Sequence, residues 1–223
     1  ATTEIYTLPL HDALPIFTLG DYLEQFRSKE KALQLFRVLE KLEPVLDHIH
    51  RNQIYHLDIK PGNIIVDSSR ELHVSLIDFG LALNKKEADI RKTLFPLGFA
   101  APELLLNQLE LVDARTDYFA LGISCWMCLQ GRMPLIDPNP SITTNLQLTY
   151  PLPGLDSKYS VLNEVLQKMA AKHQFTVPPN KLSPEDLKTA LMKGMNKRYD
   201  SYSQWISDFE KQLNKQKKGW WPF

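Results

Sequence analysis

The chain has 223 residues, of which 43% are hydrophobic and 23% are charged, and its formal net charge is zero. This composition is typical of one soluble globular domain and gives no sign of the basic surface that a nucleic-acid partner requires. No apolar run reaches the roughly 18 residues of a membrane span, and the longest run, 119–129, favours a buried helix instead.

The two cysteines, Cys125 and Cys128, both lie inside this apolar run. Neither a second cysteine pair nor a nearby group of histidines accompanies them. The further ligands of a zinc site and the partners of a redox site are therefore missing. We therefore interpret them as reduced thiols in a core helix. Because no secretory signal is visible either, we expect a cytoplasmic protein.

The first part of the chain combines an irregular segment with a long amphipathic pattern. Residues 1–16 contain two Leu-Pro steps and fit poorly with the rest of the chain, so we expect a leader that is unrelated to the domain. A short helix is predicted over 19–26. A longer helix is predicted over 31–52, because apolar residues recur there every three or four positions. Pro44 lies inside this pattern and is expected to kink the helix.

Beyond this helix the pattern changes. Three short segments rich in β-branched residues, 54–57, 64–66 and 72–77, predict strands around a loop. From residue 102 the chain is helical in character again, but residues 134–153 are rich in Pro, Asn and Thr and are expected to form a loop. Further helices are predicted over 160–172, 184–195 and 201–215. The fold class predicted is mainly α, with short strands around the loop.

One octapeptide, 56–63 (His-Leu-Asp-Ile-Lys-Pro-Gly-Asn), carries the most informative chemistry. Asp58 is followed five residues later by Asn63, with Lys60 between them. In a phosphoryl-transfer site, an Asp can accept the proton of an attacking hydroxyl and a Lys can neutralise charge on the transferred group. An Asn can hold a metal ion through its amide oxygen. An Asp in a loop can also simply close a turn, so the octapeptide alone is suggestive.

Two further motifs come later in the chain, 77–80 (Ile-Asp-Phe-Gly) and 101–103 (Ala-Pro-Glu). Together with the octapeptide they give the order HxDxKxxN, DFG, APE, which resembles the protein kinase family. Later segments extend the resemblance to residue 213, and phrases such as 112–117 are most similar to bacterial serine/threonine kinases.

The resemblance implies a kinase-like fold, ATP and Mg²⁺ as cofactors, and transfer of a phosphoryl group to a protein substrate. It makes Asp58 the catalytic base and Lys60 the contact to the phosphate. It makes Asn63 and Asp78 the Mg²⁺ ligands and packs Ile65 against the adenine.

The same resemblance implies several structural roles. His56 and Phe79 become spine residues, Asp117 holds the backbone of the catalytic loop, and Glu103 pairs with Arg198. Four further histidines show no convergent partner pattern, and we interpret them as ordinary solvated or packed side chains. They are His48, His50, His73 and His173.

Several features of the family are missing from the sequence. The nine glycines form no GxGxxG, and no Val-Ala-x-Lys precedes the octapeptide. We therefore expect residues 17–214 to form the large helical lobe of a kinase without its small N-terminal lobe. Such a fragment is expected to fold at least in part but not to turn over ATP alone, because positioning of the phosphates needs both lobes.

Two departures lie inside the matching part. Pro96 stands where serine/threonine kinases usually have a Thr, and Leu57 replaces the Arg that commonly pairs with a phosphate on the activation loop. Thr93 is the only hydroxyl side chain between Gly80 and Phe99. We therefore expect that activation-loop phosphorylation is not required.

Two alternative functions stay open, a pseudokinase or scaffold that binds partners, and a small-molecule kinase similar to the antibiotic phosphotransferases. The intact Asp58, Lys60 and Asn63 favour an enzyme over the scaffold, and the Ala-Pro-Glu motif favours a protein substrate. At the C-terminus, residues 215–223 combine lysines with two tryptophans. They are interpreted either as a solvated end or as the juxtamembrane part of a membrane anchor beyond Phe223.

Overall fold

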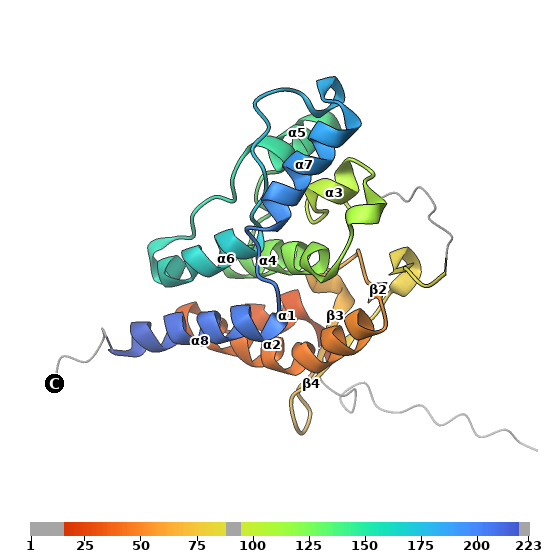
Figure 1. Ribbon diagram of the computed structural model, residues 1–223. Helices are drawn as coiled ribbons and strands as arrows, with labels where there is room; N and C mark the ends of the chain where they lie inside the picture. The colour runs from red at the N-terminus through yellow and green to blue at the C-terminus, as the bar shows by residue number, and fades with distance from the viewer. Residues whose placement is uncertain (1–15, 88–94, 219–223) are drawn as a thin grey trace, which may run out of the picture.

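The computed structural model describes residues 16–87 and 95–218, and most of them form helices (Figure 1). The α-helices are α1 Leu19–Glu24, α2 Ser28–Arg51, α3 Pro102–Leu105, α4 Ala114–Gln130, α5 Pro140–Thr149, α6 Asn163–Met169, α7 Pro184–Met195 and α8 Tyr202–Lys218. The strands are β1 Ile16–Thr18, β2 Ile54–Tyr55, β3 Ile64–Asp67, β4 His73–Leu76 and β5 Leu83–Asn84. None of the helices described is long and apolar enough to cross a bilayer.

The strands form two small antiparallel sheets. One has the order β1-β3-β4, and β2 pairs with β5 in the other. The octapeptide leaves β2 and enters β3 through a single 3-10 turn, η2 Pro61–Asn63. The ends of this loop are therefore fixed by both sheets, which places 56–63 over the helical part of the molecule.

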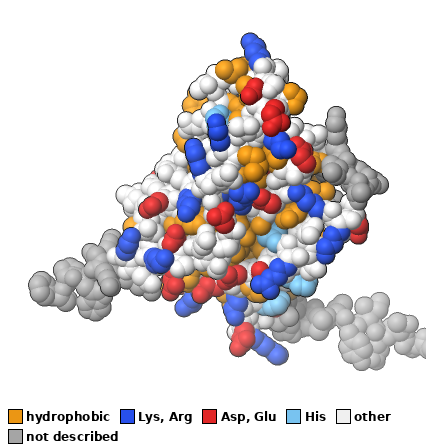
Figure 2. Space-filling model, in the orientation of Figure 1, with side chains coloured by type: hydrophobic (Ala, Val, Ile, Leu, Met, Phe, Trp, Pro, Cys, Tyr) orange, Lys and Arg blue, Asp and Glu red, His pale blue; other side chains and the backbone are white. Residues whose placement is uncertain are grey.

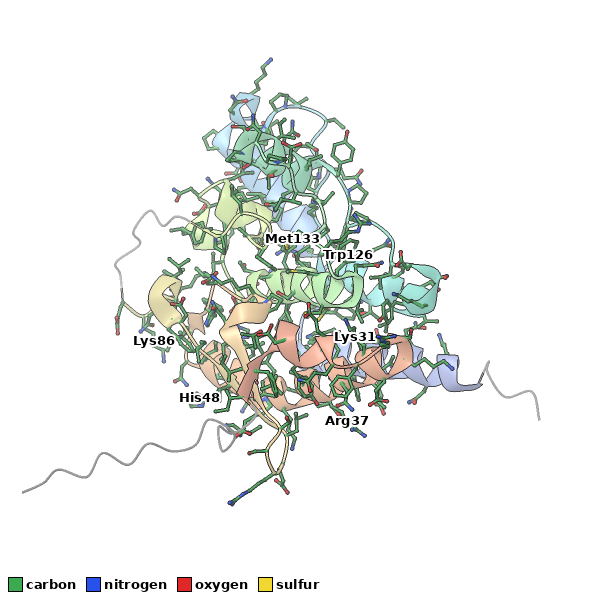
Figure 3. The ribbon with its side chains drawn as sticks, turned by 180° about the vertical axis from the view of Figure 1, so that it is seen from behind. Lys31, Arg37, His48, Lys86, Trp126 and Met133 are labelled. Carbon is green, nitrogen blue, oxygen red and sulfur yellow. The ribbon has the colours of Figure 1, made fainter. Side chains whose placement is uncertain are left out.

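The helices lie in three groups, which Figure 1 shows one above another. α8 lies beside α2, α4 lies beside α6, and α3, α5 and α7 form the third group. In Figure 3, Trp126 and Met133 mark the place where the α4 region meets this third group. The indole N–H of Trp126 donates to the Pro153 carbonyl at 2.8 Å, so the ring is fixed at this junction.

The predicted amphipathic pattern of α2 is confirmed. Leu35, Leu39, Leu42 and Leu46 are fully buried, and the face that they form packs against α8. The hydroxyl of Tyr202 in α8 donates to the Leu39 carbonyl at 2.7 Å. Burial of several large side chains, each contributing about 1.5–3 kcal/mol, stabilises this pair of helices far more than helix propensity does.

The apolar run 119–129 forms most of α4, as predicted. Asp113 and Thr116 form a capping box at its start, which satisfies two of the free N–H groups of the first turn. A Cβ at Gly122 would lie 2.8 Å from the Cβ of Met169, so α4 and α6 approach more closely than a larger residue allows. Cys125 and Cys128 are free and buried in this helix, and burial raises the pKa of Cys128 to about 12.

Other expectations need correction. The loop predicted over 134–153 contains α5, because Asn139 caps the helix by accepting from the Ser141 N–H and Pro140 suits the first turn. α2 is one helix through Pro44, and the expected kink there stays a prediction. The helix predicted over 160–172 is a 3-10 turn, η5 Ser157–Leu162, followed by the shorter α6. Ile16, expected to belong to a leader, begins β1 and pairs with Asp67.

The predictions for Thr93 and for the end of the chain at Phe223 fall outside the described residues. On the face that Figure 2 shows, acidic and basic side chains alternate without a large area of one sign. This mixture agrees with the zero formal net charge of the chain.

Candidate active site

Asp117 fixes the backbone of the octapeptide. Its carboxylate accepts the His56 N–H through Oδ2 and the Leu57 N–H through Oδ1, each at 2.9 Å. Asp117 is fully buried in the first turn of α4, so these bonds are shielded from water. The predicted role of Asp117 in holding the loop is confirmed by these bonds. Hydrogen bonds to a buried charge are stronger than neutral ones.

His50 supplies a third bond to the same carboxylate, which the sequence interpretation missed. Its Nε2 lies 2.7 Å from Oδ2 of Asp117, and it must be the donor because a carboxylate only accepts. His48, two residues earlier, is exposed on the outer side of α2 (Figure 3). The two histidines differ only by their helical phase, so the signal available in the sequence was that His50 follows the apolar face of α2 more closely than His48.

Asp58, Lys60 and Asn63 come together as predicted from their spacing. The Lys60 ammonium donates to both carboxylate oxygens of Asp58, at 3.1 and 2.8 Å. The amide nitrogen of Asn63 donates to the Asp58 carbonyl at 2.8 Å and to its Oδ2 at 2.9 Å. Both amide protons of Asn63 are thus used within the loop, and its amide oxygen is the atom that can bind a cation.

His56 connects the catalytic loop to the segment after β4. Its Nε2 lies 2.9 Å from the Ile77 carbonyl and therefore donates to it, while Nδ1 accepts the Asp58 N–H at 3.3 Å. The ring contacts Phe79 edge to face, with 4.7 Å between centroids. The two rings are thus in contact, and the expected role of His56 and Phe79 as spine residues stays a prediction. In addition, the Ile77 N–H donates to the Asn63 carbonyl at 2.9 Å.

Asp78 occupies a much more open position. It has a left-handed backbone, with φ 63°, and accepts the Gly80 N–H at 3.3 Å within its own turn. Its side chain is exposed, and so is the neighbouring Phe79, of which 44% is accessible. Ile65 is half-buried on β3, opposite Thr18 and Ser75. Both predicted site residues therefore have side chains that solvent can reach, Asp78 more than Ile65.

Glu103 and Arg198 form the buried ion pair that was predicted. Two parallel bonds of 2.6 and 2.9 Å join the guanidinium to the carboxylate, and both side chains are almost completely buried. Thr116 donates to the same carboxylate at 2.9 Å. Since Thr116 directly precedes Asp117, the ion pair supports the start of α4 from which the catalytic loop is held.

The described residues contain no group of three or more His, Cys, Asp or Glu side chains that could hold a metal ion by themselves. The pair Asn63 and Asp78 nevertheless fits Mg²⁺, because that ion is usually held by one or two carboxylates together with substrate phosphates and water. Asn63 and Asp78 supply an amide oxygen and a carboxylate. The Ile77–Asn63 backbone bond ties the segments that carry them together.

A mainly helical fold that brings an Asp, a Lys and an Asn into contact on one loop is the arrangement expected of a phosphoryl-transfer protein of the kinase class. The comparison with known families agrees. The chain matches the model of the protein kinase domain over residues 12–213, and it therefore belongs to the protein kinase family. The match begins at residue 12 and does not divide the domain into lobes, so the absence of a small lobe stays a prediction.

Individual relatives are similar to about half of the chain. The smooth-muscle myosin light chain kinase of Gallus gallus is 31% identical over 121 residues, which are 54% of this chain and 6% of that protein. A protein of Bifidobacterium longum named "Probable serine/threonine-protein kinase pknA2" is 34% identical, covering 56% of this chain and 17% of its own length. Protein kinase kin1 of Schizosaccharomyces pombe is 30% identical, covering 51% of this chain and 13% of its own length. The matched part is less than a fifth of each relative.

Proposed function

We propose that this chain carries the phosphoryl-transfer residues of a serine/threonine protein kinase, which moves the γ-phosphoryl group of ATP to a hydroxyl of a protein. The observation that carries the proposal is the contact of Asp58 with both Lys60 and Asn63 in a loop held by Asp117. The names of two relatives, from Bifidobacterium longum and Enterocytozoon bieneusi, include serine/threonine-protein kinase and support this substrate class.

In this proposal Asp58 orients the substrate hydroxyl and accepts its proton. Its carboxylate is 5% exposed, which keeps bulk water from competing for that position. Lys60 is the more accessible partner, with 34% of its side chain exposed. Its ammonium can therefore contact the transferred phosphoryl group while it remains close to Asp58.

Asn63 and Asp78 are the proposed holders of Mg²⁺, and Ile65 is the proposed contact to the adenine of ATP. When bound, Mg²⁺ neutralises charge on the phosphates of the nucleotide. The half-buried position of Ile65 on β3 and the exposed carboxylate of Asp78 support a nucleotide on the accessible side of the loop.

The sequence holds neither GxGxxG nor Val-Ala-x-Lys, and we propose that the 223-residue chain alone does not turn over ATP. In protein kinases the Gly-rich loop and the strand lysine contact the phosphates, and correct alignment of the reacting groups can contribute about 7–11 kcal/mol. A scaffold without activity is the second candidate, and Pro96, in the position of the usual Thr, is the observation that favours it.

The test compares the full-length protein with this chain, using γ-labelled ATP, Mg²⁺ and matched peptides that differ only by Ser, Thr or Tyr. The proposal predicts label on the Ser and Thr peptides from the full-length protein and none from the chain. Label that disappears in Asp58→Asn supports the enzyme. Full-length protein that binds partners but transfers no label supports the scaffold and contradicts the proposal.

A further inference from the structure

Leu57 belongs to a small apolar cluster that is separate from the main core. Its buried members are Leu57, Leu83, Ala100, Leu104, Leu109 and Val112, and we name this group the Leu57 cluster. It joins the catalytic loop to β5, to the segment 95–101, to α3 and to the 3-10 turn η4 Leu109–Leu111. Because it is not continuous with the core around α2, α4 and α8, it can loosen without general unfolding.

The backbone of Leu57 is held in a conformation that leucine rarely adopts. Its φ is +61°, in the left-handed region, where a Cβ is disfavoured. Two interactions keep it there: its N–H donates to Asp117, and its side chain is 4% exposed inside the cluster. The next residue is Asp58, so the position of that carboxylate depends on how firmly Leu57 is packed.

The segment that leads to α3 packs on the same cluster through Phe95 and Ala100, whereas Phe99 and Ala101 pack on the main core. Ala100 is 2% exposed within it, and Phe95 packs against its edge as a partly buried ring. Leu97, two residues after Phe95, is 41% exposed and is not part of the cluster. Every member is apolar, so burial and not charge fixes this segment against the catalytic loop.

We propose that Leu57 is a positioning residue, and that its cluster clamps Phe95 and Ala100, in the segment before α3, to the catalytic loop by apolar contact. The clamp holds the backbone that presents Asp58. Its consequence for Asp58 rests on the proposed function, whereas the clamp itself does not, because it is a property of packing that can be measured without phosphoryl transfer.

The first experiment compares Phe95→Ala with its matched control Leu97→Ala in the 223-residue chain, using site-resolved hydrogen exchange. Probes are the amides of Ala100, which donates to the Pro96 carbonyl, and of Leu57. Phe95→Ala is expected to speed exchange at both by at least about tenfold, and Leu97→Ala by less than about twofold. Amides of α2 and α8 should not change in either variant. Equal exchange in the two variants overturns the clamp.

The second experiment replaces the central residue by Leu57→Arg and Leu57→Met. Met keeps the volume and the apolar character and should leave exchange at Ala100 unchanged, whereas Arg should speed it at least as much as Phe95→Ala does.

In the full-length protein, Phe95→Ala should lower kcat by about tenfold, and Phe95→Leu should restore most of it. If the full-length protein shows no transfer but the exchange pattern holds, the proposed function fails and the clamp stands. If transfer is normal in Phe95→Ala and exchange is unchanged, the clamp fails and the proposed function stands.

Discussion

Asp58 and Asp78 each lie at or directly after a left-handed backbone position, yet their side chains are held very differently. A left-handed residue precedes Asp58, and Asp78 is itself left-handed, with φ values of 61° and 63°. Asp58 is buried and bonded to Lys60 and Asn63, in a loop whose N–H groups meet Asp117. Asp78 is exposed, with a 3.3 Å bond inside its own turn. The difference indicates that this chain organises the Asp58 side of the site by itself, whereas Asp78 is held by one bond within its own turn.

The strongest way to break this comparison is to change each carboxylate in the full-length protein. Asp58→Asn is expected to lower kcat by about 10²–10⁴-fold with little change in nucleotide affinity, since proton acceptance matters only in the transfer step. Asp78→Ala is expected to remove Mg²⁺-dependent nucleotide binding. The checks are steady-state kinetics and titration of nucleotide with and without Mg²⁺. Equal loss of binding in both variants would contradict the separate roles.

The second prediction concerns the ion pair that supports the buried half. Glu103→Gln leaves the Arg198 guanidinium buried without a charge partner, so the free energy of unfolding should fall by about 3–5 kcal/mol. Lys211→Ala is the matched control, because it breaks an exposed pair with Asp208 and should cost less than about 1 kcal/mol. Denaturant unfolding followed by circular dichroism measures both. Similar losses in the two variants would show that the buried pair has no special role.

Much of the helical fold could be predicted from the sequence, because α2, α7 and α8 carry a strong apolar period or clear caps. α5 could not, since its Pro and Thr residues read as loop and only the Asn139 cap favours a helix. Two contacts were predicted from the family resemblance rather than from spacing. They are the hold of Asp117 on the loop backbone and the ion pair between Glu103 and Arg198. The bond between His50 and Asp117 spans 67 residues, and no local pattern specifies such a contact. The Leu57 cluster is likewise assembled from distant segments.

The third prediction uses the two histidines of α2. His50→Phe keeps an aromatic ring but removes a donor from the buried Asp117 carboxylate, so it should lower the free energy of unfolding by about 1–3 kcal/mol. The His48 side chain is exposed on the same helix, so His48→Phe should change the free energy of unfolding by less than about 0.5 kcal/mol. Exchange at the His56 amide should rise in the first variant only. No difference between the variants would remove His50 from the account of the loop.

The smallest expected effect is a dependence on pH that arises beside the buried ion pair. Burial, with a smaller contribution from the charge of Arg198, lowers the pKa of Lys172 from 10.5 to about 7. Between these values the unfolded chain binds more protons than the folded one, so the stability contributed by Lys172 rises with pH.

Lys172→Met removes this contribution and serves as the reference. The free energy of unfolding of the wild type minus that of Lys172→Met should increase from pH 7 toward pH 10 and stay constant below pH 7. The comparison of two chains cancels the titration of other groups. A difference that is flat over this range would show that the Lys172 ammonium is not buried as described.

The central claim, that the chain itself fixes the Asp58 side of the site, is tested most directly by hydrogen exchange in the unmodified 223-residue chain. The probes are the amides of His56 and Leu57, both bonded to Asp117, and of Gly80, which donates to Asp78. The account predicts that His56 and Leu57 are protected at least about a hundredfold more than Gly80, relative to the intrinsic rates. Protection within about threefold for all of these amides would contradict it, because both sides of the site would then be equally mobile.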